Sequence, residues 1–459
     1  MAPKTATRKA YIVGVGQTAF EKPRNRVDYP ELAVEAATKA LLDAGVNYDE
    51  IEQAFAGYVY GDSTCGQRAL YALGMTKIPI MNVNNNCSTG SSALWLARQA
   101  IEYGIADCVM ALGFEKMAPG SLTNAFNDRD PPLSKTVGLM ADMDKMTTGP
   151  FAAQIFGNGA QEYIEKYGAT WEDVAAIAAK SHTHSVNNPY AQFHNAMTTE
   201  EVLADKKVTD KLTRAMCCPT SDGSACAIVC SEDFVKAHKL ENQTIEIAAM
   251  AMATDSPRLF EDRSSIELTG ADMTRTCAKE VYSKAGITVD QVQVIELHDC
   301  FAANELLLYD ALGLSKPGKA HELVRNRDNT FGGRFVVNPS GGLLSKGHPL
   351  GATGIAAAWF VVQQLRGWAG PMQDPRVVPG VMEKDGKTAY GLAHNLGLGG
   401  SCVVTLLRRP SFYESEKKGP DGRDRLGYEH GHECRPVTMA DVDKVKSKKA
   451  FSKWAEANL

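Results

Sequence analysis

The segment STGSSALWLARQ, residues 88–99, has a counterpart later in the chain, and this pair of segments indicates the fold. The counterpart is ATGIAAAWFVVQ, residues 352–363, in which Thr, Gly, Ala, Trp and Gln recur at matching places. Both segments are apolar on nearly every face, which is typical of helices buried between two layers. Each follows a turn, so we expect two equivalent buried helices whose first residues lie beside loops.

Two further pairs of segments repeat in the same order along the chain. AGVNYDEI at 44–51 resembles AGITVDQV at 285–292, and CVMAL at 108–112 resembles CVVTL at 402–406. Three such matches in sequence predict two similarly folded halves. Strand-like runs alternate with helix-like runs in both halves, and this alternation is typical of α/β layers.

The alternation is lost between residues 118 and 218, where Met, Pro, Asn, His and Lys occur in mixed order. We interpret this region as an inserted, largely helical loop domain that covers a site. The polar composition after Arg409 predicts a mobile tail, with a short helix near its end. The expected division is an N-terminal half (1–117), the loop domain (118–218), a return to the N-terminal half (219–257), a C-terminal half (258–409) and the tail (410–459).

Composition excludes several classes of protein. The 459 residues suffice for two or three cores, and 44% apolar with 22% charged residues is typical of soluble globular proteins. A net charge of -5 and a pI of about 6.1 argue against a nucleic-acid binder. We find no apolar run long enough for a transmembrane segment or a secretory signal. The eleven cysteines include several within apolar runs, which favours a reducing compartment.

Cys87 lies in the sequence NNNCSTGS, at the turn between an apolar strand and the first buried helix. Unpaired N–H groups and the helix dipole favour a thiolate at such a place, which would make Cys87 a nucleophile. The alternative is a small buried cysteine that fills a corner. The turn alone does not separate the two interpretations.

His348 lies in SKGHPLG, just before the second buried helix. Aligning the two halves places Gly351 opposite Cys87, so His348 is on the equivalent turn, three residues upstream. If the halves pack about a pseudo-twofold axis, the two helix N-termini meet and the imidazole can take the proton of Cys87. A histidine in a Gly/Pro loop is otherwise usually a surface residue.

His298 and Cys300 follow an aliphatic strand in the segment ELHDCF. Ligands of α/β proteins usually bind at strand ends. Because His298 and Cys300 are two residues apart, an extended backbone would direct both side chains to the same side. The alternative is a turn with a capping Asp299 and a packed Cys300.

The glycines of HNLGLGG, residues 394–400, allow a backbone to approach a ligand closely and to offer N–H groups to an oxyanion. Without other signals this is a glycine-rich turn. Together, however, two cysteines, two histidines and a glycine loop predict one kind of reaction. A thiolate accepts an acyl group, a second group moves a proton at carbon, and N–H donors hold the oxyanions.

These motifs resemble the thiolase superfamily, most closely thiolases of the sterol-carrier-protein type, from about residue 9 to 408. The motifs are GYVYGDSTCGQRALYALGMTKIPIMNVNNNCSTGS, ALGFEKM, HSVNNPY, CCPTSDG, ELHDCF, NPSGGLLSKGHPLGATG and HNLGLGG. The resemblance implies the thiolase fold, a five-layered αβαβα core of two duplicated halves with an inserted loop domain. It also implies at least a homodimer.

The resemblance implies a role for each candidate residue. Cys87 would be the nucleophile that carries the acyl group, and His348 would accept its proton and contribute to an oxyanion hole. Backbone N–H groups near Cys87 and Gly397 would hold a second oxyanion. His298 would stand where many thiolases have an Asn that orders an oxyanion-hole water.

The sequence departs from many thiolases at two motifs. Those enzymes have Asn-Glu-Ala-Phe where this chain has residues 298–301, and Cys-x-Gly where it has Asn395-Leu396-Gly397. The second catalytic cysteine is therefore missing at 395. In the sterol-carrier type the cysteine of His-Asp-Cys-Phe is taken to replace it, so Cys300 is the expected acid/base.

The implied activity is cleavage of 3-ketoacyl-CoA by CoA, with both as substrates and with neither a cofactor nor a metal. Two alternatives share the fold: a non-catalytic subunit that binds acyl-CoA or lipid, and a condensing or aldol-cleaving enzyme. The tail is too short and polar for a carrier domain, so lipid carriage is not expected.

The last three residues, Ala457-Asn458-Leu459, resemble a degenerate Ser-Lys-Leu peroxisomal address. The interpretation predicts a peroxisomal protein that meets an import receptor, in β-oxidation of fatty acids or of branched or sterol side chains. An accidental terminus is the alternative, with the cytoplasm or the mitochondrion as location.

Overall fold

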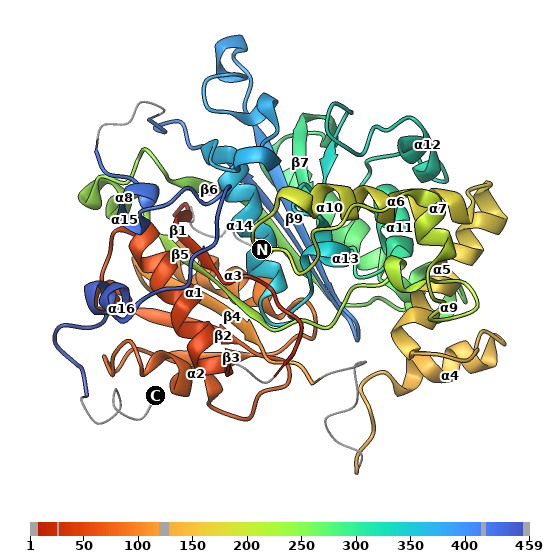
Figure 1. Cartoon of the computed structure of the whole chain (residues 1–459), viewed down its shortest axis with the longest axis horizontal. Helices are drawn as coiled ribbons and strands as arrows, with labels where there is room; N and C mark the ends of the chain where they lie inside the picture. Colours follow the sequence, from red (N-terminus) through yellow and green to blue (C-terminus); the bar gives the residue numbers. More distant parts are fainter. Residues whose placement is uncertain (1–7, 25–26, 119–127, 415–418, 453–459) are drawn as a thin grey trace, which may run out of the picture.

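The computed structural model describes residues 8–24, 27–118, 128–414 and 419–452, whose ten strands form one mixed sheet (Figure 1). Along the sheet the order is β3-β2-β4-β5-β1-β6-β10-β9-β7-β8. Within these residues, every helix is too short or too polar to cross a bilayer.

The N-terminal half supplies the first five strands of this order. Its elements are β1 (Tyr11–Gln17), α1 (Tyr29–Ala44), β2 (Gln53–Gly57), α2 (Cys65–Leu70), β3 (Ile80–Val83), α3 (Thr89–Glu102), β4 (Cys108–Glu115), β5 (Gly223–Cys230) and α8 (Glu232–His238). Helix α1 has a capping box at Asp28 and ends at Gly45, which is in the left-handed conformation.

The C-terminal half repeats this arrangement. Its elements are β6 (Ile245–Ala253), α9 (Arg258–Glu261), α10 (Ala271–Ala285), β7 (Val292–Glu296), α11 (Ala302–Ala311), α12 (Ala320–Arg325), β8 (Val336–Val337), α13 (Gly342–Lys346), α14 (Thr353–Arg366), β9 (Tyr390–Gly397) and β10 (Ser401–Arg408). Read outward from the β1–β6 joint, the strand orders β1-β5-β4-β2-β3 and β6-β10-β9-β7-β8 match position by position. The predicted duplication is therefore confirmed.

One of the three sequence echoes is wrong. The segment at 108–112 lies in β4, but the segment at 402–406 lies in β10, which corresponds to β5. Strand β4 corresponds instead to β9, because each runs parallel to one neighbour and antiparallel to the other. Short apolar strands resemble one another by composition alone. The longer echoes, at the ends of α1 and α10 and in α3 and α14, do occupy equivalent places.

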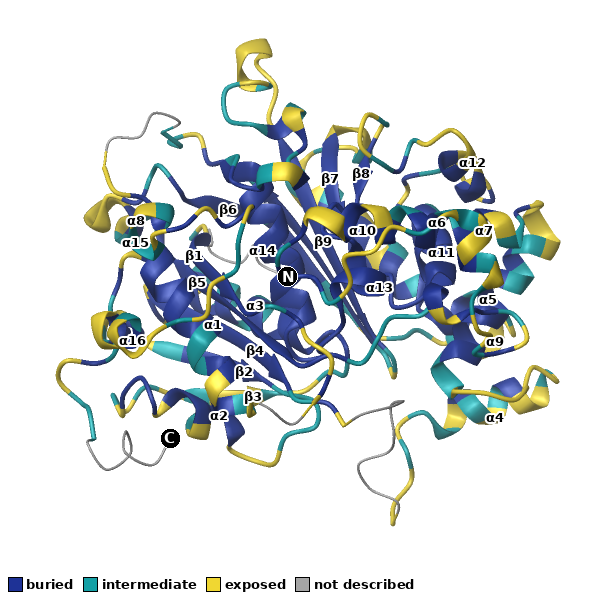
Figure 2. Cartoon of the chain, in the orientation of Figure 1, coloured by how far each residue is buried: buried dark blue, intermediate teal, exposed yellow. Residues whose placement is uncertain are grey.

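Only Tyr11 and Ile12 of β1 pair with β6, and the two halves of the sheet both pack on α3 and α14. The two halves of the sheet therefore form two of the expected five layers. In β1, Tyr11 and Val13 pack with α1, whereas Ile12 and Val15 face a central core built around α3 and α14. Helices α10 and α11 pack in a separate hydrophobic core, on the outer side of the strands of the C-terminal half. Figure 2 shows the strands and α14 buried, and exposed residues on the outer helix α8.

The region predicted as a loop domain is largely helical where the structure describes it. It contains α4 (Ser134–Asp142), α5 (Phe151–Tyr167), α6 (Trp171–His184) and α7 (Thr199–Ala204). Helices α5 and α6 pack on α11, and Phe156 of α5 stacks on Phe301 with ring centroids 5.0 Å apart. The domain is thus anchored directly beside the ELHDCF segment. The exact boundaries of the five-part division stay a prediction.

The tail differs from the mobile segment that we expected. Its helices α15 (Gly422–Leu426) and α16 (Met439–Val445) pack on α1. Arg425 donates hydrogen bonds to the carbonyls of Leu42 (2.8 Å) and Asp43 (2.5 Å), at the C-terminal end of α1. Polar composition was misleading here, because the charged groups satisfy the free carbonyls of a helix end.

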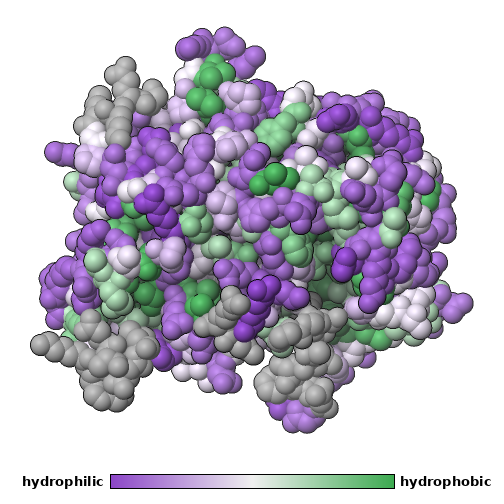
Figure 3. All heavy atoms as spheres, viewed as in Figure 1, coloured by the Kyte–Doolittle hydropathy of each residue, from purple (hydrophilic) through white to green (hydrophobic). Residues whose placement is uncertain are grey.

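The N-termini of α3 and α14 meet, as predicted, and glycine makes their approach possible. A Cβ at Gly90 would lie 2.7 Å from the carbonyl oxygen of Gly351. A Cβ at Gly354 would lie 2.2 Å from Asn395 Oδ1 and 2.3 Å from Ser91 Oγ. The face of the molecule seen in Figure 3 is mostly polar, with small separate apolar areas.

Gly354→Ala is expected to destabilise the protein by about 1–3 kcal/mol, because the new methyl group overpacks the contact between the central helices. Thermal denaturation measures the effect. Gly138→Ala in α4 is the matched control, since its Cβ meets nothing within 4 Å and the change favours the helix by about 0.5–1 kcal/mol. Equal melting temperatures for the two variants would contradict the close approach.

Candidate active site

Cys87 lies in a tight turn between β3 and α3. Asn86 has φ +50°, a left-handed conformation that asparagine tolerates better than most residues, and its side chain donates to the carbonyl of Leu398 (3.0 Å). The N–H groups of Ser88 and Thr89 donate to the carbonyls of Asn85 and Asn86. These bonds hold the thiol in one place, with only 5% of the residue exposed.

The glycine turn after β9 lies directly against the turn that carries Cys87. A Cβ at Gly397 would lie 2.2 Å from the carbonyl oxygen of Asn85, so only glycine fits. The backbone N–H of Leu398 lies close enough to the Cys87 thiol to oppose the increase in its pKa. The loop therefore brings at least one backbone donor to the thiol, while the oxyanion role of the Gly397 N–H stays a prediction.

Burial changes the pKa of Cys87 in the direction opposite to that expected from the helix N-terminus. It raises the pKa of the thiol to about 12, and the nearby Glu115 carboxyl adds to the increase. Glu115 is itself buried and accepts hydrogen bonds from the N–H groups of Val59, Tyr60 and Gly351; burial raises its pKa to about 8. Cys87 is therefore a thiol at rest, and it needs a base.

His348 has the hydrogen bonds of such a base. The hydroxyl of Thr353 donates to the carbonyl of Pro349 (2.9 Å), so it accepts from Nδ1–H of His348 (2.8 Å). This tautomer leaves a lone pair on Nε2, which has no hydrogen-bond partner within the described residues. Burial, with the charge of Lys346, lowers the pKa of His348 to about 3, so the ring is neutral.

His298 has the opposite tautomer. The amide of Asn395 donates to Nδ1 of His298 (3.0 Å), which leaves the proton on Nε2. Burial, with the neighbouring His348, holds the pKa of His298 well below its usual value. The centroids of the His298 and His348 rings lie 5.0 Å apart, with an angle of 81° between the ring planes. One nitrogen of each ring and the sulfur of Cys87 all lie within 4.8 Å of one another. An acceptor and a donor therefore flank the thiol.

Cys300 lies near this group of side chains, since the Cys87 thiol acts on its pKa. It is buried between β7 and α11, and its carbonyl accepts from the N–H of Cys218 (2.9 Å). Burial raises the pKa of the Cys300 thiol well above its usual value, and the nearby thiols of Cys218 and Cys87 raise it further. Asp299 accepts from the N–H of Leu343 in α13 (2.6 Å), so it caps a different helix from the one we expected.

The structure adds residues that the sequence did not single out as functional. Thr353 and Asn395 fix the tautomers of the two histidines, Glu115 acts on Cys87, and Cys218 is a third thiol beside Cys300. The repeat held a signal for Thr353, because Thr89 at the matching place of the first half makes the equivalent bond to Asn86. Cys218 had no such signal.

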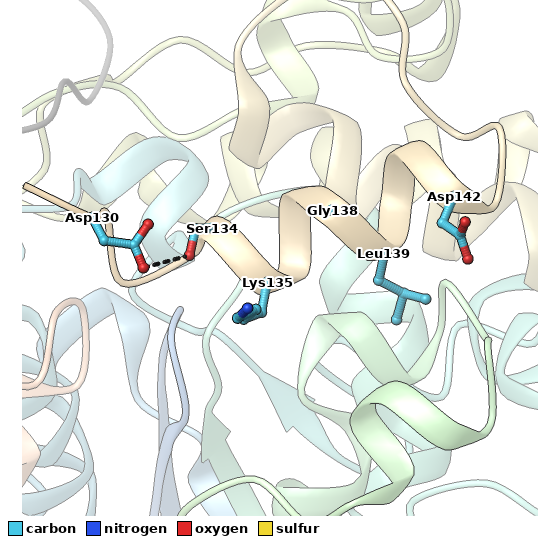
Figure 4. Close-up of a pocket in the computed structure, with 6 residues that line it drawn as sticks. All are labelled: Asp130, Ser134, Lys135, Gly138, Leu139 and Asp142. Atoms are coloured by element: carbon cyan, nitrogen blue, oxygen red, sulfur yellow. Dashed lines mark hydrogen bonds between the residues drawn. The ribbon is translucent and has the colours of Figure 1, made fainter.

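A surface hollow lies elsewhere, along helix α4 of the loop domain. Figure 4 shows the lining residues, which come from this helix and the turn before it: Asp130, Ser134, Lys135, Gly138, Leu139 and Asp142. The cysteines and histidines described above do not line it. This hollow has no place in the chemistry of the site.

Two family models match the chain: the thiolase N-terminal domain over residues 10–233 and the thiolase C-terminal domain-like model over 255–394. The chain belongs to the thiolase family. Sterol carrier protein 2 of Gallus gallus is 54% identical over 401 residues, which cover 87% of this chain and 71% of that protein.

More distant relatives extend this comparison. An acetyl-CoA acetyltransferase of Methanothermobacter thermautotrophicus is 31% identical over 408 residues, covering 88% of this chain and 100% of that protein. The solved structure of an Ltp2-ChsH2(DUF35) aldolase has a TM-score of 0.71 at 21% identity, covering 88% of this chain and 98% of that chain. At that identity the likeness concerns the fold alone.

Proposed function

We propose that the protein is a 3-ketoacyl-CoA thiolase, an acyltransferase that works through an acyl-cysteine on Cys87. The observation that carries the proposal is the placement of the Cys87 thiol beside an unpartnered imidazole nitrogen of His348 and a donor-tautomer His298. Membership of the thiolase family and the similarity to an acetyl-CoA acetyltransferase support acyl transfer.

In the first half-reaction, Cys87 gives its proton to Nε2 of His348 and attacks the 3-keto carbon. The resulting oxyanion accepts hydrogen bonds from the backbone N–H groups of Cys87 and Gly397. When the C2–C3 bond breaks, the enolate oxygen is held by His298 Nε2–H and the protonated His348. Cys300 then donates a proton to C2, which releases acetyl-CoA or propanoyl-CoA and leaves a Cys300 thiolate.

In the second half-reaction, the Cys300 thiolate takes the proton of free CoA. The CoA sulfur attacks the acyl group, and the shortened acyl-CoA leaves as the Cys87 sulfur recovers its proton from His348. Each group thus returns to its starting state. Because the pKa of Cys87 is about 12 and that of His348 about 3, the proton moves together with the attack on the bound substrate and not before it.

The wider setting is also part of the proposal. We propose that the protein works in β-oxidation of fatty acids or of branched or sterol side chains, as a peroxisomal homodimer; the similarity to a sterol carrier protein supports a lipid substrate. The suggested import signal, Ala457-Asn458-Leu459, lies outside the described residues. Acyl-CoA and CoA are the proposed ligands.

The first test is CoA-dependent cleavage of straight-chain and 2-methyl-branched 3-ketoacyl-CoA by the purified protein. The proposal predicts turnover that yields acetyl-CoA from the first substrate and propanoyl-CoA from the second. Binding of acyl-CoA without turnover would identify a binding subunit. Cleavage of a 3-hydroxyacyl-CoA that needs no CoA would identify an aldol-cleaving enzyme.

A further inference from the structure

The proposed acyl-transfer site has the side chains of a metal site. The sulfur of Cys87 and one nitrogen each of His298 and His348 lie within 4.8 Å of one another, and all three residues are buried. Thiolate sulfur and imidazole nitrogen are the ligands that Zn²⁺ prefers, and three protein ligands with an open fourth position are a recurrent zinc arrangement.

The outer hydrogen bonds also match those of metal-binding histidines. Such histidines usually use their second ring nitrogen for a bond to a neighbouring group, which orients the ring. Here Nδ1 of His348 bonds to Thr353 Oγ1 (2.8 Å) and Nδ1 of His298 to Asn395 Nδ2 (3.0 Å). Both Nε2 atoms are left for the site, and that of His348 is buried without a partner among the described residues.

We propose that Cys87, His298 and His348 bind one Zn²⁺ ion, which occupies the sulfur that acts as nucleophile in the proposed function. With bonds of about 2.0 Å to nitrogen and 2.3 Å to sulfur, tetrahedral ligand atoms lie roughly 3.3–3.6 Å apart. The ligand atoms now lie within 4.8 Å of one another, so zinc binding requires them to move closer together. Binding releases the thiol proton of Cys87 to solvent, and water fills the fourth position.

One adjustment accompanies binding. His298 Nε2 must lose its proton to coordinate zinc, so the proton moves to Nδ1, where the Asn395 amide now donates. Turning this amide over presents its Oδ1 as the acceptor for Nδ1–H, and Nδ2 takes the place in which Oδ1 had no partner among the described residues. The amide thus keeps one hydrogen bond to His298 in either orientation.

Cobalt(II) in thiol-free buffer is the probe, because coordination by sulfur gives a charge-transfer absorption band that needs no substrate. The proposal predicts one Co²⁺ per chain, displaced by Zn²⁺, with the band absent in Cys87→Ala. If that variant fails to fold, His348→Ala provides a second test, since loss of this ligand must also weaken binding. His298→Ala must weaken binding by more than the roughly 10–100-fold typical of an outer-shell change.

Asn395→Asp provides a gain of affinity that an adventitious site cannot reproduce. A carboxylate on Nδ1 of His298 favours the metal-binding tautomer, so cobalt should bind roughly 10–100-fold more tightly. Cys434→Ser, in the HGHEC stretch of the tail, should leave the band unchanged. A band that survives loss of Cys87, or equal affinity in His298→Ala and wild type, overturns the zinc site. Because no turnover is measured, these results are independent of the proposed thiolase activity.

Discussion

Cys87→Ala is expected to lower CoA-dependent cleavage of 3-ketoacyl-CoA by roughly 10⁴–10⁶-fold, the loss typical when a catalytic nucleophile is removed. The turn that carries Cys87 is held by backbone bonds and by the Asn86 side chain, so the change should leave the fold intact. Steady-state thiolysis measures the loss, and thermal denaturation checks the fold.

Cys226→Ala is the matched control for this loss. Cys226 is a fully buried cysteine of β5 that packs with the outer α1 layer, away from the central helices. Its replacement removes the same atoms from a core and should affect stability rather than catalysis. If both variants lose activity equally, the loss comes from the fold and the assignment of Cys87 as nucleophile is wrong.

Cys300→Ala is expected to lower thiolysis by roughly 10²–10⁴-fold, the usual contribution of a positioned acid or base. Unlike the Cys87 variant, it should still accumulate an acyl-enzyme, because the nucleophile and the base His348 remain. Rapid quenching with substrate and without CoA, followed by mass spectrometry of the intact protein, measures the trapped acyl group.

Cys218→Ala separates this role from a general effect of thiols in the site. Cys218 is adjacent to Cys300 through a backbone hydrogen bond, but the proposed mechanism does not use its sulfur. Its replacement should leave thiolysis close to the wild-type rate. A large loss in Cys218→Ala together with a small one in Cys300→Ala would transfer the acid/base role to Cys218.

The fold was predictable mainly through α3 and α14, because close packing leaves few alternatives there. Gly90 and Gly354 leave no room for a Cβ, and Thr89 and Thr353 each satisfy a carbonyl before their helix. These residues recur in both halves because the same geometry recurs. The strand segments at 108–112 and 402–406 carry no such constraint, and their similarity misled the alignment.

The electrostatic state of the site was not predictable from local sequence. The position of Cys87 before α3 favoured a thiolate, but burial by distant segments raises its pKa to about 12. The tautomers of His298 and His348 depend on Asn395 and Thr353, whose side chains meet the rings only in the folded chain. The attached tail was missed for a similar reason, since Arg425 finds its partners at the far end of α1.

Mapping of the acylated residue tests the central claim most directly. The wild-type protein is mixed with a 3-ketoacyl-CoA in the absence of free CoA, quenched in acid, digested and analysed by mass spectrometry. The account predicts one acyl group per chain, on the peptide that contains Cys87, and its removal when CoA is added before the quench. An unmodified Cys87, or an acyl group that CoA does not remove, would contradict it.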